Sequence, residues 1–311
     1  MAVYEVFSHP ELRRYRTTLW SGASIILIFT LFLTFIPPLF IVYRSQGFWK
    51  KTDTYREYPD VRFKNELLMV AELEGDGNYV TYSTFQTYNT LQQNHLRVPL
   101  ITSREEDSNG DGRADLLTFT LELPLADTEN ILGMKLLLFF DYKLYQFSTL
   151  TMEGMGYLNH DSPKGGARYD VVGELRFNQK EPLKHTGTDD RYNTSIIDSS
   201  SIYAEDFHLP TIFQNYVERN LTTYLHAPYT AWSTGRGKGQ PFIVSARISY
   251  PEEGFTYIPG FWYLIKWGWV QYVSVLLIFL FIFDRIKVFI YQNQLVNTMV
   301  AKAWREEIKA S

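Results

Sequence analysis

The residues best suited to chemistry in this sequence lie in one short acidic segment, "DSNGDGRADL", at residues 107–116. Its side-chain oxygens recur at alternate positions, a glycine follows, and a further carboxylate comes near the end: Asp107, Asn109, Asp111, Gly112 and Asp115. Oxygen ligands at positions one, three, five and nine, with glycine at six, have the spacing of a calcium-binding loop. At position seven, Arg113 would contribute only its backbone carbonyl oxygen. The segment therefore predicts a calcium site.

A calcium-free turn is the main alternative, because Asn, Asp and Gly are also the ordinary residues of turns. An EF-hand is disfavoured, since position twelve is Thr118 instead of a bidentate Glu and no helical pattern flanks the loop. The segment resembles the single calcium loops of integrin-type propeller repeats, but it occurs once and therefore predicts no propeller. Glu105 and Glu106 precede it closely enough to help close the coordination. We expect a structural ion that fixes the entry to a strand over residues 116–123.

Two apolar segments set the membrane topology. Residues 22–42 carry no charged side chain, and residues 267–283 form a second uncharged run that reaches back to residue 261 if one lysine is tolerated. A hydrocarbon core of about 30 Å needs roughly 20 helical residues, so both segments are expected to span. No small-residue cleavage site follows the first segment, which argues against a signal peptide. Pro37 and Pro38 predict a kink or an early end to its helix.

These segments divide the chain into five predicted parts. Residues 1–20 are expected to form a short cytoplasmic N-terminal helix with basic side chains, and residues 21–43 the first transmembrane helix. Residues 44–260 form the large extracellular or lumenal domain, and residues 261–283 the second transmembrane helix. A cytoplasmic C-terminal tail at residues 284–311 completes the chain.

Two N-glycosylation sequons indicate the orientation of the large domain. "NTS" at Asn193 and "NLT" at Asn220 accept sugar only if they reach the lumen. The calcium loop points the same way, because extracellular modules bind calcium with dissociation constants on the order of 10⁻⁴–10⁻³ M. We therefore expect both termini in the cytoplasm.

The large domain carries the alternation typical of β-strands. "LTFTLEL", "VVGELRF" and "FIVSARISY" alternate apolar with polar residues, and residues 61–72, 79–85 and 135–152 are less regular strand candidates. Such strands predict an antiparallel, sandwich-like sheet with one buried face. One short helix is expected over residues 210–219, where apolar residues recur at helical spacing.

The rest of the sequence offers no active site. The chain has no cysteine, and its six histidines form no zinc-binding pattern. No G-x-S-x-G motif is present, and the glycine-rich "TGRGKGQP" lacks the strand-to-helix context of a phosphate loop. The net charge of −4 without a basic patch argues against nucleic acid as a partner. We therefore predict no enzyme, no small-molecule substrate and no cofactor other than structural calcium.

Within the apolar segments, four polar side chains are candidates for helix–helix contact. Gln271 and Ser274 lie three residues apart on the second segment, and Thr30 and Thr34 lie four apart on the first. Such groups can hydrogen-bond across a helix pair with a modest gain of about 0.6–2 kcal/mol. The equal alternative is that the hydroxyls bond back along their own helices.

Six segments of the chain are similar in order and spacing to the transmembrane protein 231 family. The similarity runs from the first residue to about Leu295, and the last residues, "MVAKAWREEIKAS", lie outside it. The segments are "MAVYEVFSHPELRRYR", "FIPPLFIVYRSQGFW", "TSREEDSNGDGRADLLTFTLELPL", "DRYNTSII", "ERNLTT" and "PGFWYLIKWGWVQYVSVLLIFLFIFDRIKVFIYQNQ".

The resemblance implies a two-span glycoprotein of the ciliary transition zone that belongs to the tectonic-like (Meckel syndrome) complex. Its implied partners are other transition-zone membrane proteins, the tectonics and meckelin-like subunits. Its implied role is to help form a diffusion barrier between ciliary and plasma membranes and to support ciliogenesis and Hedgehog signalling. The alternative hypothesis is a calcium-dependent adhesion or receptor-type membrane protein in which the acidic loop contributes to a ligand face.

Overall fold

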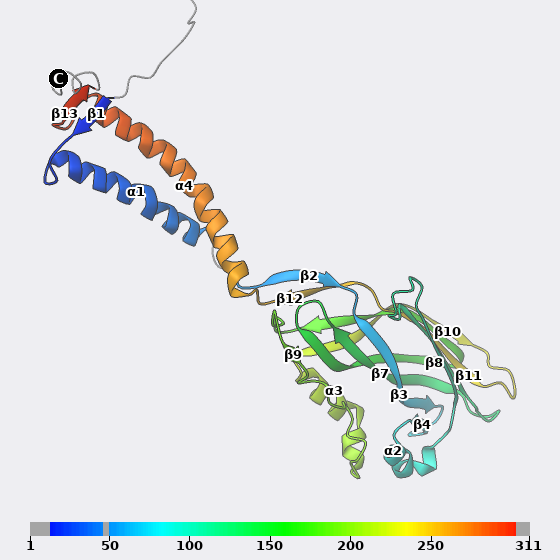
Figure 1. Ribbon diagram of the computed structural model, residues 1–311. Helices are drawn as coiled ribbons and strands as arrows, with labels where there is room; N and C mark the ends of the chain where they lie inside the picture. The colour runs from blue at the N-terminus through cyan, green and yellow to red at the C-terminus, as the bar shows by residue number, and fades with distance from the viewer. Residues whose placement is uncertain (1–12, 46–49, 303–311) are drawn as a thin grey trace, which may run out of the picture. The chain divides into compact units, whose positions relative to one another are not determined.

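The computed structural model describes residues 13–45 and 50–302 of the chain. The chain forms two compact units, one built from Met1–Lys51 and Pro259–Ser311 and the other from Thr52–Ile258. The first unit holds the two long helices (Figure 1), and the second is the β-rich domain.

In the first unit, α1 (Gly22–Arg44) packs beside α4 (Phe261–Gln292). Ser21 caps α1 by accepting a hydrogen bond from the Ser24 backbone N–H at 3.4 Å. The helix continues through Pro37 and Pro38, so the expected early end does not occur.

The described ends of this unit form a pair of strands, whereas a helix was expected at the N-terminal end. β1 (Arg13–Arg16) pairs antiparallel with β13 (Met299–Lys302). The prediction of a helix over residues 1–20 is therefore wrong for its described part, since residues 13–16 find a partner strand far along the chain; residues 1–12 lie outside the described range. The prediction of a C-terminal tail likewise misses β13. α4 itself continues past residue 283 to Gln292.

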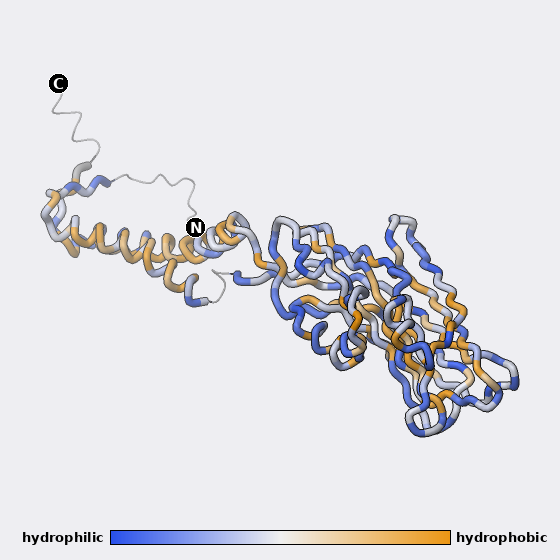
Figure 2. The backbone as a smooth tube through the Cα atoms, turned by 90° about the horizontal axis from the view of Figure 1, so that it is seen from below, coloured by the Kyte–Doolittle hydropathy of each residue, from blue (hydrophilic) through white to orange (hydrophobic). Residues whose placement is uncertain are grey.

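By length and composition, one helix of the described chain, α1, can cross a membrane. Only 22% of its most apolar window is buried, which separates it from the core helix of a soluble protein. α4 is longer but less apolar, because Lys266 interrupts its first half and Asp284, Arg285 and Lys287 its second. Hydrophobic residues nevertheless occur along most of the length of both helices (Figure 2).

The β-rich domain contains a nine-stranded sheet and a separate two-stranded ribbon. Along the sheet the order is β4-β3-β7-β8-β11-β6-β5, while β9 and β10 also pair with β8. The strands of the sheet are β3 (Asp60–Leu73), β4 (Tyr79–Ser83), β5 (Leu100–Glu106), β6 (Leu116–Leu123), β7 (Ile131–Leu144), β8 (Thr149–Gln179), β9 (Thr188–Asp189), β10 (Leu221–Thr234) and β11 (Phe242–Ser249). The ribbon consists of β2 (Asp53–Glu57) and β12 (Glu253–Tyr257).

The long strand β8 joins the two halves of the sheet. Its first half pairs with β7, and its second half pairs with β10 on one edge and with β11 on the other. Inward side chains of β3 and β7 share one core with those of β6 and β11, and the rings of Phe63 and Phe119 lie 5.8 Å apart. The domain is thus one sheet folded over on itself. Most pairings are antiparallel as predicted, but β8 runs parallel to β9 and β11.

The predicted alternation matches the buried faces of the strands. Leu117, Phe119, Leu121 and Leu123 of β6 are all fully buried, as are their counterparts on β11. The candidate strand over residues 135–152 is wrong as a single element, because it covers the end of β7, a turn and the start of β8. Both arms of that hairpin are apolar, and its turn contains neither glycine nor proline to mark the break.

Helices cover the outer face of β7, where Leu137 and Phe139 belong to a second buried cluster. α3 (Leu209–Val217) corresponds to the predicted helix. α2 (Gln86–Leu91), η1 (Gln93–His95) and η2 (Ala204–Phe207) show that the expectation of one short helix was wrong. These elements are too short to repeat an apolar spacing, so no periodic signal reveals them.

Candidate functional site

The acidic loop joins β5 to β6 and is closed by hydrogen bonds to its own backbone. Asp107 accepts from the Gly110 N–H at 2.7 Å and from the Gly112 N–H at 2.8 Å. Gly110 and Gly112 have φ values of 74° and 85°, a conformation that favours glycine. The amide of Gly112, together with the neighbouring loop amides, lowers the pKa of Asp107 although its side chain is exposed. The loop is therefore a nest of amides around one carboxylate.

The side chains of the other predicted calcium ligands also accept hydrogen bonds from backbone amides of the loop. Asn109 accepts from the Asp111 N–H at 2.8 Å, and Asp111 from the Arg113 N–H at 2.8 Å. Asp115 accepts from the Ser108 N–H at 2.9 Å. Within residues 13–45 and 50–302, no three His, Asp or Glu side chains are arranged to hold a metal ion. Calcium binding at this loop stays a prediction.

The flanking glutamates do not close the loop as we expected. Glu105 accepts a hydrogen bond from the Phe63 N–H of β3 at 2.7 Å, which ties the free edge of β5 to β3. The Glu106 side chain pairs with Arg104 at 3.4 Å, while its carbonyl oxygen accepts from the Asp115 N–H at 2.8 Å. Both glutamate side chains therefore make their contacts with residues of the sheet and not with the loop.

Arg113 acts through its side chain and not only through its backbone. Its guanidinium donates to the Tyr58 carbonyl oxygen and lies over the ring of Tyr145 at 5.8 Å. Together with Asp111 and Glu252 these residues line a shallow, polar cleft of about 410 Å³. The sequence pattern gave no indication of this contact, because Tyr58 and Tyr145 are distant along the chain.

The two sequons differ in accessibility. Asn193 is exposed, in a turn closed by its N–H and the Asp190 carbonyl oxygen at 3.0 Å. Asn220 is only half-exposed, and its Nδ2 donates to Glu181 at 3.0 Å. The structure therefore favours Asn193 as the better acceptor for a sugar.

In the helix pair, the hydroxyls that we considered for cross-helix contact bond along their own helices. Thr30 donates to Ile26 at 2.7 Å, Thr34 to Thr30 at 2.7 Å and Ser274 to Val270 at 2.8 Å, in each case to the carbonyl oxygen. Thr30 and Thr34 are buried on the side of α1 that also buries Ala23, Pro38 and Val42, whereas Ser274 is exposed. The amide oxygen of Gln271 is buried and has no hydrogen-bond partner.

Two tyrosines that no sequence pattern singles out make hydrogen bonds across the helix pair. Tyr272 of α4 donates to the Phe35 carbonyl oxygen of α1 at 3.2 Å, and Tyr291 donates to that of Ala23 at 3.0 Å. The later residue of α4 bonds to the earlier residue of α1, so the two helices run antiparallel. A tyrosine reaches across a helix pair with its hydroxyl beyond a flat ring, whereas threonine is too short.

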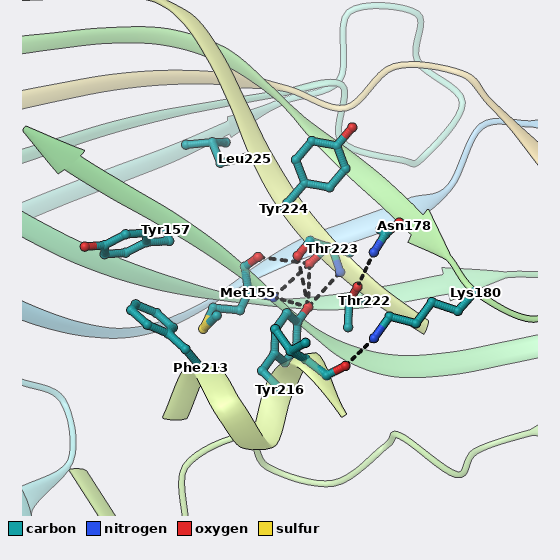
Figure 3. A pocket seen from close by; sticks show the side chains of 11 residues that line it. Met155, Tyr157, Asn178, Lys180, Phe213, Tyr216, Thr222, Thr223, Tyr224 and Leu225 are labelled. Carbon is teal, nitrogen blue, oxygen red and sulfur yellow. Dashed lines mark hydrogen bonds between the residues drawn. The ribbon is translucent and has the colours of Figure 1, made fainter. Parts of the chain in front are cut away.

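An apolar groove of about 450 Å³ lies between α3, β8 and β10 (Figure 3). Its walls are Met155, Tyr157, Asn178, Lys180, Phe213, Tyr216, Val217, Thr222, Thr223, Tyr224 and Leu225. Val217 and Tyr224 are 62% and 50% exposed, so large apolar surface faces solvent at its rim. Such surface commonly marks a site of interaction.

The floor of the groove is rigidly built. The Tyr216 hydroxyl accepts from the N–H groups of Met155 at 3.1 Å and Thr223 at 2.7 Å, and donates to the Thr223 carbonyl oxygen at 3.2 Å. At one end the rings of Tyr157 and Phe213 lie 4.8 Å apart, and at the other Lys180 donates to the Val217 carbonyl oxygen. The groove presents contact surface but no nucleophile beside a base.

Comparison with known proteins places this architecture among membrane proteins. The family model described as Transmembrane protein 231 matches residues 1–300. A curated Xenopus tropicalis protein named Transmembrane protein 231 is 47% identical over 299 residues, which is 96% of each chain. The Homo sapiens protein of that name is 49% identical over 301 residues, covering 96% of this chain and 95% of the relative. The Gallus gallus protein is 49% identical over 300 residues, with 96% and 94% covered.

Proposed function

This chain belongs to the transmembrane protein 231 family, and we propose that it is a structural membrane component of the ciliary transition zone. In this role it helps to form the diffusion barrier between the ciliary and plasma membranes, and thereby supports ciliogenesis and Hedgehog signalling. The observation that carries the proposal is the match over residues 1–300, which includes both long helices and the whole β-rich domain.

The proposal includes a second membrane span formed by α4. Its antiparallel contact with α1 through Tyr272 and Tyr291 supports a helical hairpin. Large apolar side chains of α4 such as Leu277 and Phe281 are 60% and 65% exposed. Apolar surface is unfavourable in water, and burial in lipid removes this free-energy cost. The pairing of β1 with β13 keeps the two ends of the unit together. We place both ends in the cytoplasm and the β-rich domain outside or in the lumen.

In this arrangement the β-rich domain would hold partner subunits. The groove beside α3 offers exposed aromatic and aliphatic surface of the kind that anchors protein interfaces. The partners we propose are the extracellular parts of other transition-zone membrane proteins, the tectonics and meckelin-like subunits. No feature of the acidic loop favours the adhesion or receptor hypothesis, because its oxygens point to its own amides.

Localisation in ciliated cells tests the proposal. A tagged wild-type chain should form a ring at the cilium base, and Val217→Asp or Tyr224→Asp, which place a charge at the groove, should reduce that ring. Tyr229→Asp is the matched control, because Tyr229 lies on the same strand, is 73% exposed and does not line the groove. A wild-type chain spread evenly over the plasma membrane would exclude the transition-zone role. Normal localisation of both groove variants would exclude the groove as the contact surface.

A further inference from the structure

The ribbon formed by β2 and β12 covers one end of the main core with a mainly aromatic face. Tyr55 contacts both Phe255 and Tyr257, whose ring centroids lie 5.6 Å and 5.5 Å from that of Tyr55. Phe255 in turn lies 5.2 Å from the ring of Phe177 in β8. Two glutamates interrupt this aromatic layer.

Glu57 and Glu253 are directly opposite each other in the register of the ribbon. Their exposed fractions are only 7% and 9%. Directly opposite residues of an antiparallel pair have Cβ atoms about 4.5–5.5 Å apart, and like charges at such positions are destabilising. Two ionised carboxylates are therefore an unfavourable combination at this place.

The two carboxyl groups have unequal partners. Glu57 accepts from two backbone amides of the β7–β8 turn, Tyr145 N–H at 2.8 Å and Gln146 N–H at 3.2 Å. Both oxygens of Glu253 share a single donor, the Phe177 N–H, at 3.0 Å each. Of the two, Glu253 is the less well stabilised as an anion.

No positive side chain neutralises the pair. In the described part of the chain, neither carboxylate has a Lys, Arg or His nitrogen within 4.0 Å. The nearby Arg176 is bonded to Glu174, and these two charges act in opposite directions on Glu253. A buried charge without a counter-charge is costly, and a buried acid commonly takes up a proton instead.

A buried hydroxyl without a hydrogen-bond partner also belongs to this region of the core. Tyr142 of β7 is fully buried, its ring is stacked on Phe177 at 5.3 Å, and its hydroxyl has no hydrogen-bond partner. Burial, with the added effect of the negative charges of Glu253 and Glu57, raises the pKa of Tyr142 well above its usual value. The charges of both carboxyl groups therefore act on the Tyr142 hydroxyl.

We propose that Glu253, which lies opposite Glu57 in the ribbon, carries a proton at neutral pH. The proton removes the repulsion across the ribbon and turns one carboxyl into a donor. Such a donor would suit the Tyr142 oxygen, a buried group that lacks a hydrogen-bond partner. On the ribbon itself, burial and the charge of Glu57 raise the pKa of Tyr55, so that Tyr55 stays neutral.

Protonation of Glu253 makes the attachment of the ribbon to the core dependent on pH. In sequence, β2 follows the first long helix and β12 precedes the second. Burial raises the pKa of Glu253 above its ordinary value. A raised pKa in the folded state means that the stabilisation is complete below the unfolded pKa and is lost as pH rises through the folded pKa. Deprotonation restores two adjacent charges and weakens the attachment of the ribbon to the core.

Infrared spectroscopy of the full chain in lipid nanodiscs tests this directly. A protonated carboxyl group has a C=O stretch separate from that of a carboxylate, and we expect one such band at neutral pH that disappears on titration to alkaline pH. Glu253→Gln should remove the band. Glu252→Gln, which changes an adjacent glutamate paired with Arg56 on the surface, should leave it unchanged. Absence of the band in the wild type, or its persistence in Glu253→Gln, would overturn the proposal.

Thermal unfolding of the same samples gives a second readout. The melting temperature of the wild type should fall as pH rises above the ordinary pKa of glutamate and should level off once the band has disappeared, whereas that of Glu253→Gln should change less over this range. Glu57→Gln removes the neighbouring charge and should move the loss of the band to lower pH. Equal pH dependence in the wild type and Glu253→Gln would show that Glu253 does not carry the proton.

Discussion

Tyr291 of α4 donates its hydroxyl hydrogen to the Ala23 carbonyl oxygen of α1 across 3.0 Å, and this bond joins residues at opposite ends of the sequence. Together with the hydrogen bond from Tyr272 to the Phe35 carbonyl oxygen, it joins the two helices at two positions along their length. Side-chain hydrogen bonds between membrane helices contribute about 0.6–2 kcal/mol each.

The first prediction concerns this bond. Tyr291→Phe removes the hydroxyl and keeps the ring that lies 6.0 Å from Tyr15, so the helix pair should lose about 0.6–2 kcal/mol of stability. Denaturant unfolding in detergent micelles, followed by tryptophan fluorescence, measures the change. Tyr43→Phe is the control, because Tyr43 lies on α1 and is 63% exposed. An equal effect of the two substitutions would contradict a specific role for Tyr291.

The docking of the acidic loop depends on Arg113. Arg113→Ala removes the hydrogen bond to Tyr58 and the contact with Tyr145, which should destabilise the loop by about 0.5–1.5 kcal/mol. Hydrogen exchange should then be faster at residues 107–115 and unchanged in the core strands. Arg104→Ala is a suitable comparison, since Arg104 is 76% exposed and pairs only with its neighbour Glu106. Unaltered hydrogen exchange in Arg113→Ala would show that the internal hydrogen bonds of the loop are sufficient to keep it ordered.

Loop order should also depend on pH through Asp107. Hydrogen bonds from Gly112 and other loop amides lower its pKa, so its contribution is present above the unfolded pKa and is lost as pH falls through the folded pKa. Acid titration should therefore shift the amide resonances of Gly110 and Gly112 in concert. In Asp107→Asn this titration should be absent. If these resonances titrate in the variant as in the wild type, another group is responsible.

Calcium removal tests the prediction made from the sequence pattern. A structural ion requires a higher melting temperature in millimolar calcium than in chelator, and Asp111→Ala should abolish that difference. Asp111 is the appropriate position because its side chain is exposed and bonds only within the loop. Equal wild-type melting temperatures would show that the amides of the loop suffice to fold it.

Glycosylation tests the orientation of the domain. Asn193→Gln should remove one glycan-dependent shift in gel mobility, because Asn193 is exposed. Asn220→Gln should cause no shift, since its side-chain nitrogen donates to Glu181. Treatment with a glycosidase provides the control for sugar content. If the wild type carries no sugar at either site, the domain does not reach the glycosylation machinery.

Several elements could be predicted from local sequence because their signals lie within a few neighbouring residues. The apolar run at residues 22–42 reflects the length of a membrane span, and the alternation in β6 and β11 reflects one buried face. The acidic loop was likewise visible as a loop from its Asp, Asn and Gly spacing. These features depend on composition and period, which any short window of sequence contains.

Other features required the tertiary structure, since they join residues that are far apart in the chain. β8 continues through the polar stretch near residues 159–168 because β7 pairs with its first half and β10 and β11 with its second. Arg13–Arg16 are extended because Met299–Lys302 pair with them. Glu57 and Glu253 look like ordinary surface glutamates in sequence, and only the register of the ribbon buries them opposite each other. Local periodicity determines which face of an element is apolar, whereas the partner across that face is chosen by the packing of the whole chain.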